Sequence, residues 1–174
     1  CPSNVDMAKM KAEFQHQYYK ANGIPFRTKA IANFTQSVGL ASNAPGIYNF
    51  FAKNRFTSSV VKNILGFAPQ RSLPLLHKQT LRAWFKKHKA TPTEQDFPKG
   101  KVFLFADEFT NLNDTDVGIK AVLLLERLGY EVEIPTHLES GRTYLSKGLL
   151  TEAKNLAVKN VEKLSKLVSA NAPI

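Results

Sequence analysis

Apolar and polar positions alternate most regularly between residues 101 and 150. Two short apolar runs, 101–106 and 130–134, are bounded by glycine or proline. Between them, residues 117–128 place apolar side chains at helical spacing, and a glycine follows. A further helical pattern starts near Leu149. This order predicts a βαβα unit of the α/β class, with a small parallel sheet.

The same order brings two polar loops together. A right-handed crossover places the ends of both parallel strands at one edge of the sheet. Loops 107–113 and 135–148 are therefore expected to face each other, at the edge where Rossmann-like sheets bind ligands. The candidate residues at this ligand edge are Asp107, Glu108, His137, Ser140, Gly141 and Arg142.

Four carboxylates follow the first predicted strand, at Asp107, Glu108, Asp114 and Asp116. Such a group could bind a hard cation or act as general bases. Carboxylates at the start of a helix more often cap it and complement its dipole. The second interpretation is favoured.

The loop after the second strand contains Ser140-Gly141-Arg142. Gly141 is typical of a tight turn, and Arg142 could bind an anion. His137 is the histidine nearest the ligand edge, although a solvated loop histidine is the favoured interpretation. No G-x-G-x-x-G fingerprint, P-loop or G-x-S-x-G elbow occurs in the sequence, so dinucleotide-binding and hydrolase motifs are missing.

Residues 1–90 contain helical patterns separated by glycine, proline and asparagine. The first helix has a capping box at Ser3 and Asp6 and is expected to stop at Asn22. Further helices are expected over 27–38, over 47–53, from Ser58 or Ser59 to Leu65, and over 77–87. Residues 91–100 include two prolines and no periodic pattern, which indicates a linker. The predicted domains are a helical region (1–90), this linker (91–100) and the βαβα unit (101–174).

Helical spacing also predicts the buried faces. The apolar face of the first helix is expected to comprise Val5, Met7, Met10, Phe14 and Tyr18. The buried side of the crossover helix is expected to comprise Val117, Ala121, Leu124, Leu125 and Leu128. The stripe of the last helix is expected to comprise Leu156, Val161, Leu164 and Val168.

The charge of +10 lies in the first part of the 174-residue chain. Residues 1–100 carry 15 Lys/Arg against 4 Asp/Glu, a net +11, and residues 101–174 carry 9 against 10, a net −1. A basic field of this kind attracts nucleic acid, an anionic membrane or an acidic neighbouring domain. Aromatic residues between Phe26 and Phe85 could form a surface for nucleic acid or for a membrane. The favoured interpretation is that they form a helical core with the cations on its solvent-exposed face. No apolar run reaches the roughly 20 residues of a membrane span.

Cys1, the single cysteine, excludes an internal disulfide and fits a reducing, cytoplasmic compartment. Cysteine followed by proline ends the bacterial ferredoxin motif, although a lone cysteine at the start of a helix is the simpler interpretation. One thiolate cannot hold a four-iron cluster, so no cofactor is expected in this chain alone. A chain that begins with Cys1 and ends on residues 171–174, without a terminal pattern, is expected to be part of a longer protein.

Several stretches resemble a known family. Residues 1–14 resemble the exit from the ferredoxin-like module of large FAD-linked oxidoreductases of the D-lactate and glycolate dehydrogenase type. Residues 103–111, 124–132 and 140–150 resemble the first repeat of their cysteine-rich domain, which is similar to that of heterodisulfide reductases. One departure stands out: the family's Cys-Cys-Gly-Arg loop is Glu139-Ser140-Gly141-Arg142 here, so cluster or thiol chemistry at this loop is not expected.

The resemblance implies a non-catalytic C-terminal portion of a dehydrogenase that oxidises a 2-hydroxy acid and passes electrons through [4Fe–4S] clusters. Cys1 would be an iron–sulfur ligand in the full-length protein only, together with FAD bound upstream. The implied partners are the upstream flavin and iron–sulfur domains and an electron acceptor, with peripheral contact to the inner face of the membrane. Two alternatives stay open: a basic nucleic-acid-binding or interaction module, and a small α/β enzyme that uses the 107–116 carboxylates.

Overall fold

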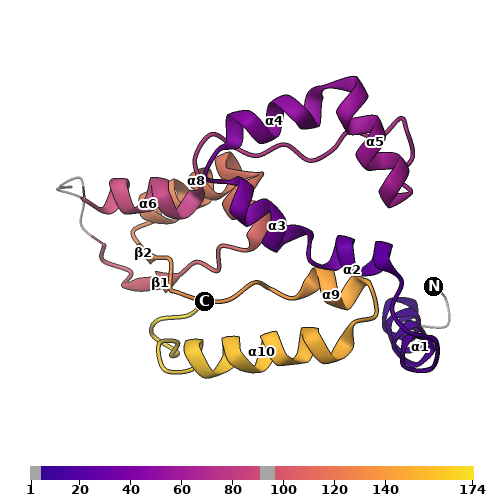
Figure 1. Ribbon diagram of the computed structural model, residues 1–174. Helices are drawn as coiled ribbons and strands as arrows, with labels where there is room; N and C mark the ends of the chain where they lie inside the picture. Colours follow the sequence, from indigo (N-terminus) through magenta and orange to yellow (C-terminus); the bar gives the residue numbers. More distant parts are fainter. Residues whose placement is uncertain (1–4, 91–96) are drawn as a thin grey trace.

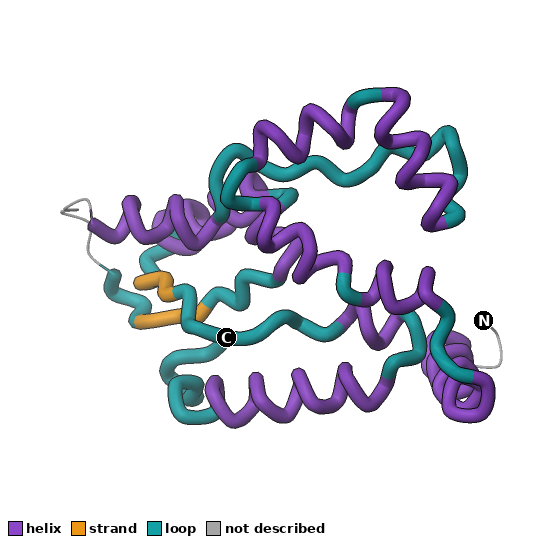
Figure 2. The backbone as a smooth tube through the Cα atoms, viewed as in Figure 1, coloured by secondary structure: helices purple, strands orange, loops and turns teal. Residues whose placement is uncertain are grey.

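The computed structural model describes residues 5–90 and 97–174. Helices dominate the first of these segments (Figures 1 and 2). They are α1 (Met7–Asn22), α2 (Phe26–Ala32), α3 (Phe34–Ala41), α4 (Pro45–Lys53), α5 (Arg55–Leu65) and α6 (Leu81–Ala90). The second segment comprises β1 (Lys101–Phe103), α7 (Glu108–Leu112), α8 (Thr115–Arg127), β2 (Glu131–Glu133), α9 (Arg142–Ser146) and α10 (Leu150–Leu164). Cys1 and residues 91–96 of the predicted linker lie outside the described residues.

The two strands form a parallel pair, with Val102 opposite Val132. The crossover between them contains α7 and α8, and two helices follow β2 (Figure 1). The predicted fold class, helices followed by a βαβα unit with a small parallel sheet, is therefore confirmed. On the other edge of β1, the Phe103 amide donates to the Pro173 carbonyl at 2.8 Å, so the last residues of the chain lie beside this strand.

Three groups of buried side chains hold the helices to the βαβα unit. Phe85 of α6 packs with Val122 of α8 and Val132 of β2. The other two groups also combine residues from both segments of the chain. They are Val38, Leu76 and Leu112, and Ala32, Tyr144 and Leu149. The helical region and the sheet unit therefore share their core.

The buried face of α8 differs from the predicted one. Val117, Leu124 and Leu128 are 64%, 58% and 47% exposed, whereas Val122 is fully buried. Helix α6 lies against the other side of α8, where a Cβ on Gly118 would overlap the Leu81 side chain. Gly118 has no side chain, so a prediction from the spacing of apolar residues does not include it. Its small size allows α6 and α8 to approach closely.

The apolar face predicted for α1 is exposed. Its members are between 42% and 72% exposed, while Ala12 is buried. The helix packs through Ala12 and Gln15 against the turn at Gly148, where the Gln15 Cβ would lie 2.5 Å from a Cβ added to the glycine. The side that packs is thus the smaller and more polar one, and the apolar stripe is left without a partner within the described residues. The α10 stripe is likewise exposed at Val161, by 66%.

Several boundaries also differ from prediction. The single helix expected over 27–38 is interrupted at Asn33, whose side chain donates to the Lys29 carbonyl at 2.8 Å and so competes with the helical pattern. Helix α5 starts at Arg55 because the Asn54 side chain caps it, not a serine. Helix α6 starts four residues later than expected. The loops 107–113 and 135–148 contain the short helices α7 and α9.

Candidate functional site

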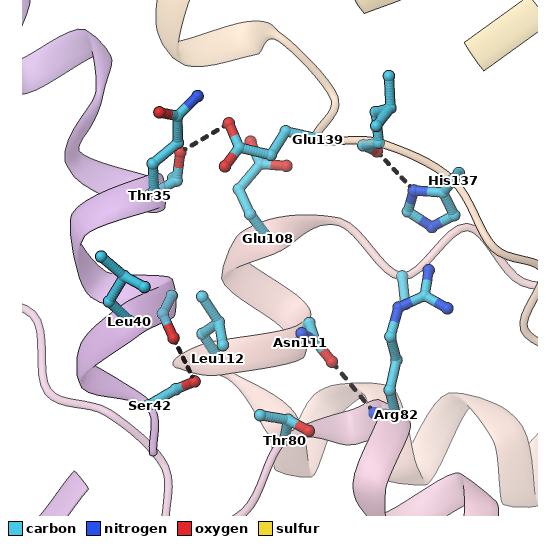
Figure 3. Close-up of a pocket in the computed structure, with 14 residues that line it drawn as sticks. Thr35, Leu40, Ser42, Thr80, Arg82, Glu108, Asn111, Leu112, His137 and Glu139 are labelled. Atoms are coloured by element: carbon cyan, nitrogen blue, oxygen red, sulfur yellow. Dashed lines mark hydrogen bonds between the residues drawn. The ribbon is translucent and has the colours of Figure 1, made fainter. Parts of the chain in front are cut away.

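A cleft of about 400 Å³ lies at the sheet edge where both strands end. Helix α3 and helix α7 form two of its walls, and the loop at residues 137–139 forms another (Figure 3). Thr80 and Arg82, at the start of α6, complete it. The cleft therefore occupies the place where the parallel strand order predicts a ligand site.

Asp107 caps α7. Its Oδ1 atom accepts hydrogen bonds from the backbone amides of Phe109 at 2.8 Å and Thr110 at 3.1 Å. Arg142 contributes a 3.4 Å ion pair to the same oxygen while its guanidinium lies 4.6 Å from the centre of the Phe109 ring. The Arg142 side chain is 56% exposed. Neither Asp107 nor Arg142 lines the cleft, and the pair joins α7 to the start of α9.

Glu108 is 7% exposed and joins the two facing loops. One carboxylate oxygen accepts from the Ser140 amide at 2.9 Å, and the other accepts from the Ser140 hydroxyl at 2.7 Å. Gly141 follows with a φ of 78°, a left-handed conformation that favours glycine, and is the N-cap residue of α9. Ser140 therefore holds the Glu108 side chain at the cleft, and Gly141 provides the turn that precedes α9.

Glu139 contributes a second carboxylate to the cleft. Its Oε2 atom accepts from the Thr35 hydroxyl at 3.0 Å. Burial raises the pKa of Glu139, the Thr35 hydrogen bond lowers it, and the nearby charge of Glu108 raises it further. On the other side of the loop, the buried Asn160 side chain of α10 donates to the Glu139 carbonyl and accepts from the Leu138 amide. The backbone of this loop is thereby fixed.

His137 lies flat on Phe105, with ring centres 3.8 Å apart. Its Nδ1 atom lies 2.6 Å from the Leu138 carbonyl oxygen, which can only accept, so this nitrogen carries a proton. The Nε2 atom is buried and has no hydrogen-bond partner among the described residues. Burial lowers the pKa of His137, and the charge of Arg82 lowers it as well. The lowered pKa favours the neutral form of the ring, and the partly buried side chain is not the solvated loop histidine that the sequence favours.

Arg82 brings a partly buried positive charge to the cleft. Its Nη2 atom donates to the Pro135 carbonyl at 2.9 Å, and its backbone amide donates to the Asn111 side chain at 3.1 Å. Burial lowers the pKa of Arg82. Arg82 and Thr35 were not predicted at the cleft, because both come from helices far from the loops in sequence and no local pattern marks them.

The predicted carboxylate group does not assemble into one site. Asp116 is 75% exposed and lies 3.4 Å from the His77 ring nitrogen, away from Asp107 and Glu108. Within the described part of the chain, no three His, Cys, Asp or Glu side chains gather where they could hold a metal ion. The cleft instead combines an arginine, a neutral histidine and two glutamates.

A second hollow, a groove of about 930 Å³, lies between α2–α3 and the pair α4–α5. Its lining is mostly apolar and includes Phe34, Phe51 and Val61. Several aromatic side chains in this groove or near it, which were expected in a core, are exposed. They are Phe26 (71%), Phe50 (66%), Phe51 (52%) and Phe56 (78%). Within residues 5–90 and 97–174, no helix is both long and apolar enough to cross a membrane.

Comparison with known proteins links the chain to one kind of enzyme. No protein-family model matches it, and no solved structure matches it. It is 24% identical over 182 residues to D-2-hydroxyglutarate dehydrogenase of Pantoea ananatis (strain AJ13355). The same-named proteins of Haemophilus influenzae (strain ATCC 51907 / DSM 11121 / KW20 / Rd) and Escherichia coli (strain K12) are each 23% identical to it. The chain is similar to one portion of these dehydrogenases.

Each of these alignments covers 100% of the chain but only 17% to 18% of the relative. The similarity agrees with the predicted resemblance to 2-hydroxy acid dehydrogenases at the level of an oxidoreductase-like segment. The iron–sulfur and cysteine-rich modules inferred from the sequence stay predictions.

Proposed function

We propose that this chain is a non-catalytic C-terminal portion of a flavin- and iron–sulfur-dependent dehydrogenase. The parent enzyme would oxidise a 2-hydroxy acid and pass electrons through [4Fe–4S] clusters. The proposal rests on the similarity to D-2-hydroxyglutarate dehydrogenases, which extends over the whole chain and over less than a fifth of those relatives. We place the enzyme in the cytoplasm, in keeping with a sequence whose single cysteine cannot form an internal disulfide.

The residues of this chain do not fit a complete cluster site. A four-iron cluster needs a full set of cysteine ligands, whereas the sequence has one cysteine. We therefore propose Cys1 as one ligand of a cluster whose other ligands lie in another part of the enzyme. FAD is likewise proposed to bind elsewhere, and no step of the reaction is assigned to this chain.

The exposed stripe on α1 supports a docking role. Met7, Phe14 and Tyr18 are 62%, 72% and 52% exposed. The rings of Phe14 and Tyr18 are stacked, with centroids 6.4 Å apart. A row of large apolar side chains on one helix face is typical of an interaction surface. Because α1 follows Cys1 closely in the sequence, we propose that this stripe packs on the iron–sulfur domain of the same enzyme.

The proposed cofactors are tested in the full-length protein, purified without oxygen. We expect a flavin spectrum over a broad iron–sulfur absorption, and about eight irons if two four-iron clusters are present. Cys1→Ser should lower the iron content by roughly half, because one cluster loses a ligand, and should leave the flavin content unchanged. A colourless, iron-free protein would refute the proposal. Full iron content in Cys1→Ser would remove Cys1 as a ligand.

The docking role is tested by measuring how tightly this chain binds the separately produced remainder of the enzyme. Phe14→Asp places a charge in the middle of the α1 stripe and should weaken binding by about tenfold or more. Ala8→Asp is the matched control, because Ala8 is exposed on another face of the same helix. Equal effects of the two substitutions, or none from Phe14→Asp, would contradict the docking role.

A further inference from the structure

The apolar groove between α2–α3 and α4–α5 has a wall on each side (Figure 1). Phe34 of α3 lines one wall, and Phe51 of α4 and Val61 of α5 line the other. Its volume of about 930 Å³ lies within the usual range for small-molecule sites. Apolar side chains on both walls gain free energy when an apolar group between them displaces water. The part of a ligand that fits here is therefore an apolar chain.

Two lysines line the groove where α2 lies beside α9 (Figure 1). Lys29 belongs to α2, and Lys147 is the C-cap residue of α9. Burial lowers the pKa of Lys147, and the nearby charges of Lys11 and Arg27 lower it further. Positive charge therefore gathers at this end of the groove.

No carboxylate balances this charge within the described part of the chain. None of the residues that line the groove is Asp or Glu, and residues 14–93 of the sequence contain neither. No ion pair among the described residues includes Lys29 or Lys147. A negative charge close to several cations is favourable, whereas a further positive charge is not. The head group that fits this end of the groove is therefore an anion.

We propose that the groove binds a free fatty acid. The acyl chain lies between the walls that contain Phe34 and Phe51, and the carboxylate pairs with Lys29 and Lys147. A bilayer surface is too broad to enter between two walls, so the occupant is a single molecule. This binding is separate from the flavin and iron–sulfur chemistry proposed above and does not depend on it.

The proposal is tested by isothermal titration calorimetry of the full-length protein with decanoate, at concentrations below those that form micelles. Decanoate should bind saturably, and octanoate should bind about 15-fold more weakly, because it lacks two CH₂ groups that contribute about 0.8 kcal/mol each. Decyltrimethylammonium, which has a similar chain and a positive head group, should bind about tenfold more weakly than decanoate or worse. Equal affinities of the two acids, or binding of the cation as tight as that of decanoate, would overturn the proposal. So would an absence of decanoate binding, including the case in which the protein binds phosphatidylglycerol vesicles instead.

Two pairs of variants place the binding in this groove. Val61→Asp should weaken decanoate binding by about tenfold or more, because it adds a carboxylate to an apolar wall. Val60→Asp is the matched control, since Val60 and Val61 are 44% and 41% exposed on the same helix and only Val61 lines the groove. Lys29→Gln should weaken binding by about threefold, whereas Lys20→Gln, at an exposed lysine that does not line the groove, should not. Equal effects within either pair would overturn the proposal, and if Val61→Asp does not fold, the lysine pair and the three ligands decide.

Discussion

Gly148 is the position where a single methyl group should loosen α1 from the rest of the molecule. Its φ of 71° lies in the left-handed region. A Cβ there would be 2.5 Å from the Gln15 Cβ, 3.1 Å from the Ala12 carbonyl oxygen and 3.3 Å from the Gln15 carbonyl carbon. Two of these three atoms belong to the α1 backbone, so the contact cannot be relieved by rotating one side chain.

The expected destabilisation by Gly148→Ala has three parts. The left-handed conformation costs an alanine about 1–2 kcal/mol, and the reduced entropy of the unfolded chain returns about 0.4–1 kcal/mol. Overlap with the α1 backbone adds about 1–3 kcal/mol, the usual range for overpacking a tight contact. The sum is a loss of about 3 kcal/mol in the free energy of unfolding, measured by denaturant titration.

Gly66→Ala is the matched control for the backbone contribution. Gly66 has a φ of 63°, and its Cβ would meet the Arg27 side chain at an ordinary 3.4 Å. This substitution should cost only about 1 kcal/mol. Amide hydrogens of α1 should also exchange faster in Gly148→Ala and not in Gly66→Ala. A cost for Gly148→Ala no greater than that for Gly66→Ala would refute the packing of α1 described above.

Two further predictions concern the hydrogen bond between α9 and the junction of α2 with α3, and the pH dependence of stability. Tyr144 is 6% exposed and donates to the Asn33 side chain at 2.6 Å, so Tyr144→Phe should cost about 1–3 kcal/mol. In a double-mutant cycle with Asn33→Ala the two losses should be less than additive, and full additivity would contradict the bond. The pKa of His137 in the folded state lies below its ordinary value of 6.5. Below pH 6.5 the unfolded chain therefore binds a proton at His137 more readily than the folded chain does, and the stability present above pH 6.5 is lost. The free energy of unfolding should therefore fall between about pH 7 and pH 5, with a smaller slope in His137→Gln; an unchanged slope would show that the histidine is not held neutral by the fold.

The order of elements in residues 101–174 followed from the sequence alone. Strand and helix periods are local properties, and glycine and proline mark the ends of the runs, so the βαβα order and the parallel sheet needed no knowledge of distant contacts. The parallel pairing of the two strands then brought the loops that follow them to one edge. That rule anticipated the meeting of Glu108 with Ser140 and of Asp107 with Arg142.

Tertiary structure alone decided which faces are buried and which residues complete the cleft. Helical spacing shows that α8 and α1 each have an apolar stripe. Which side of the helix is buried depends on which neighbour can approach it. Here Gly118 leaves space for Leu81, and Gly148 leaves space for Gln15. Thr35 and Arg82 enter the cleft because α3 and the start of α6 pack beside the sheet edge, across 104 residues of sequence in the case of Thr35 and Glu139. Contacts of that kind depend on packing of the whole chain, for which no local periodicity provides a signal.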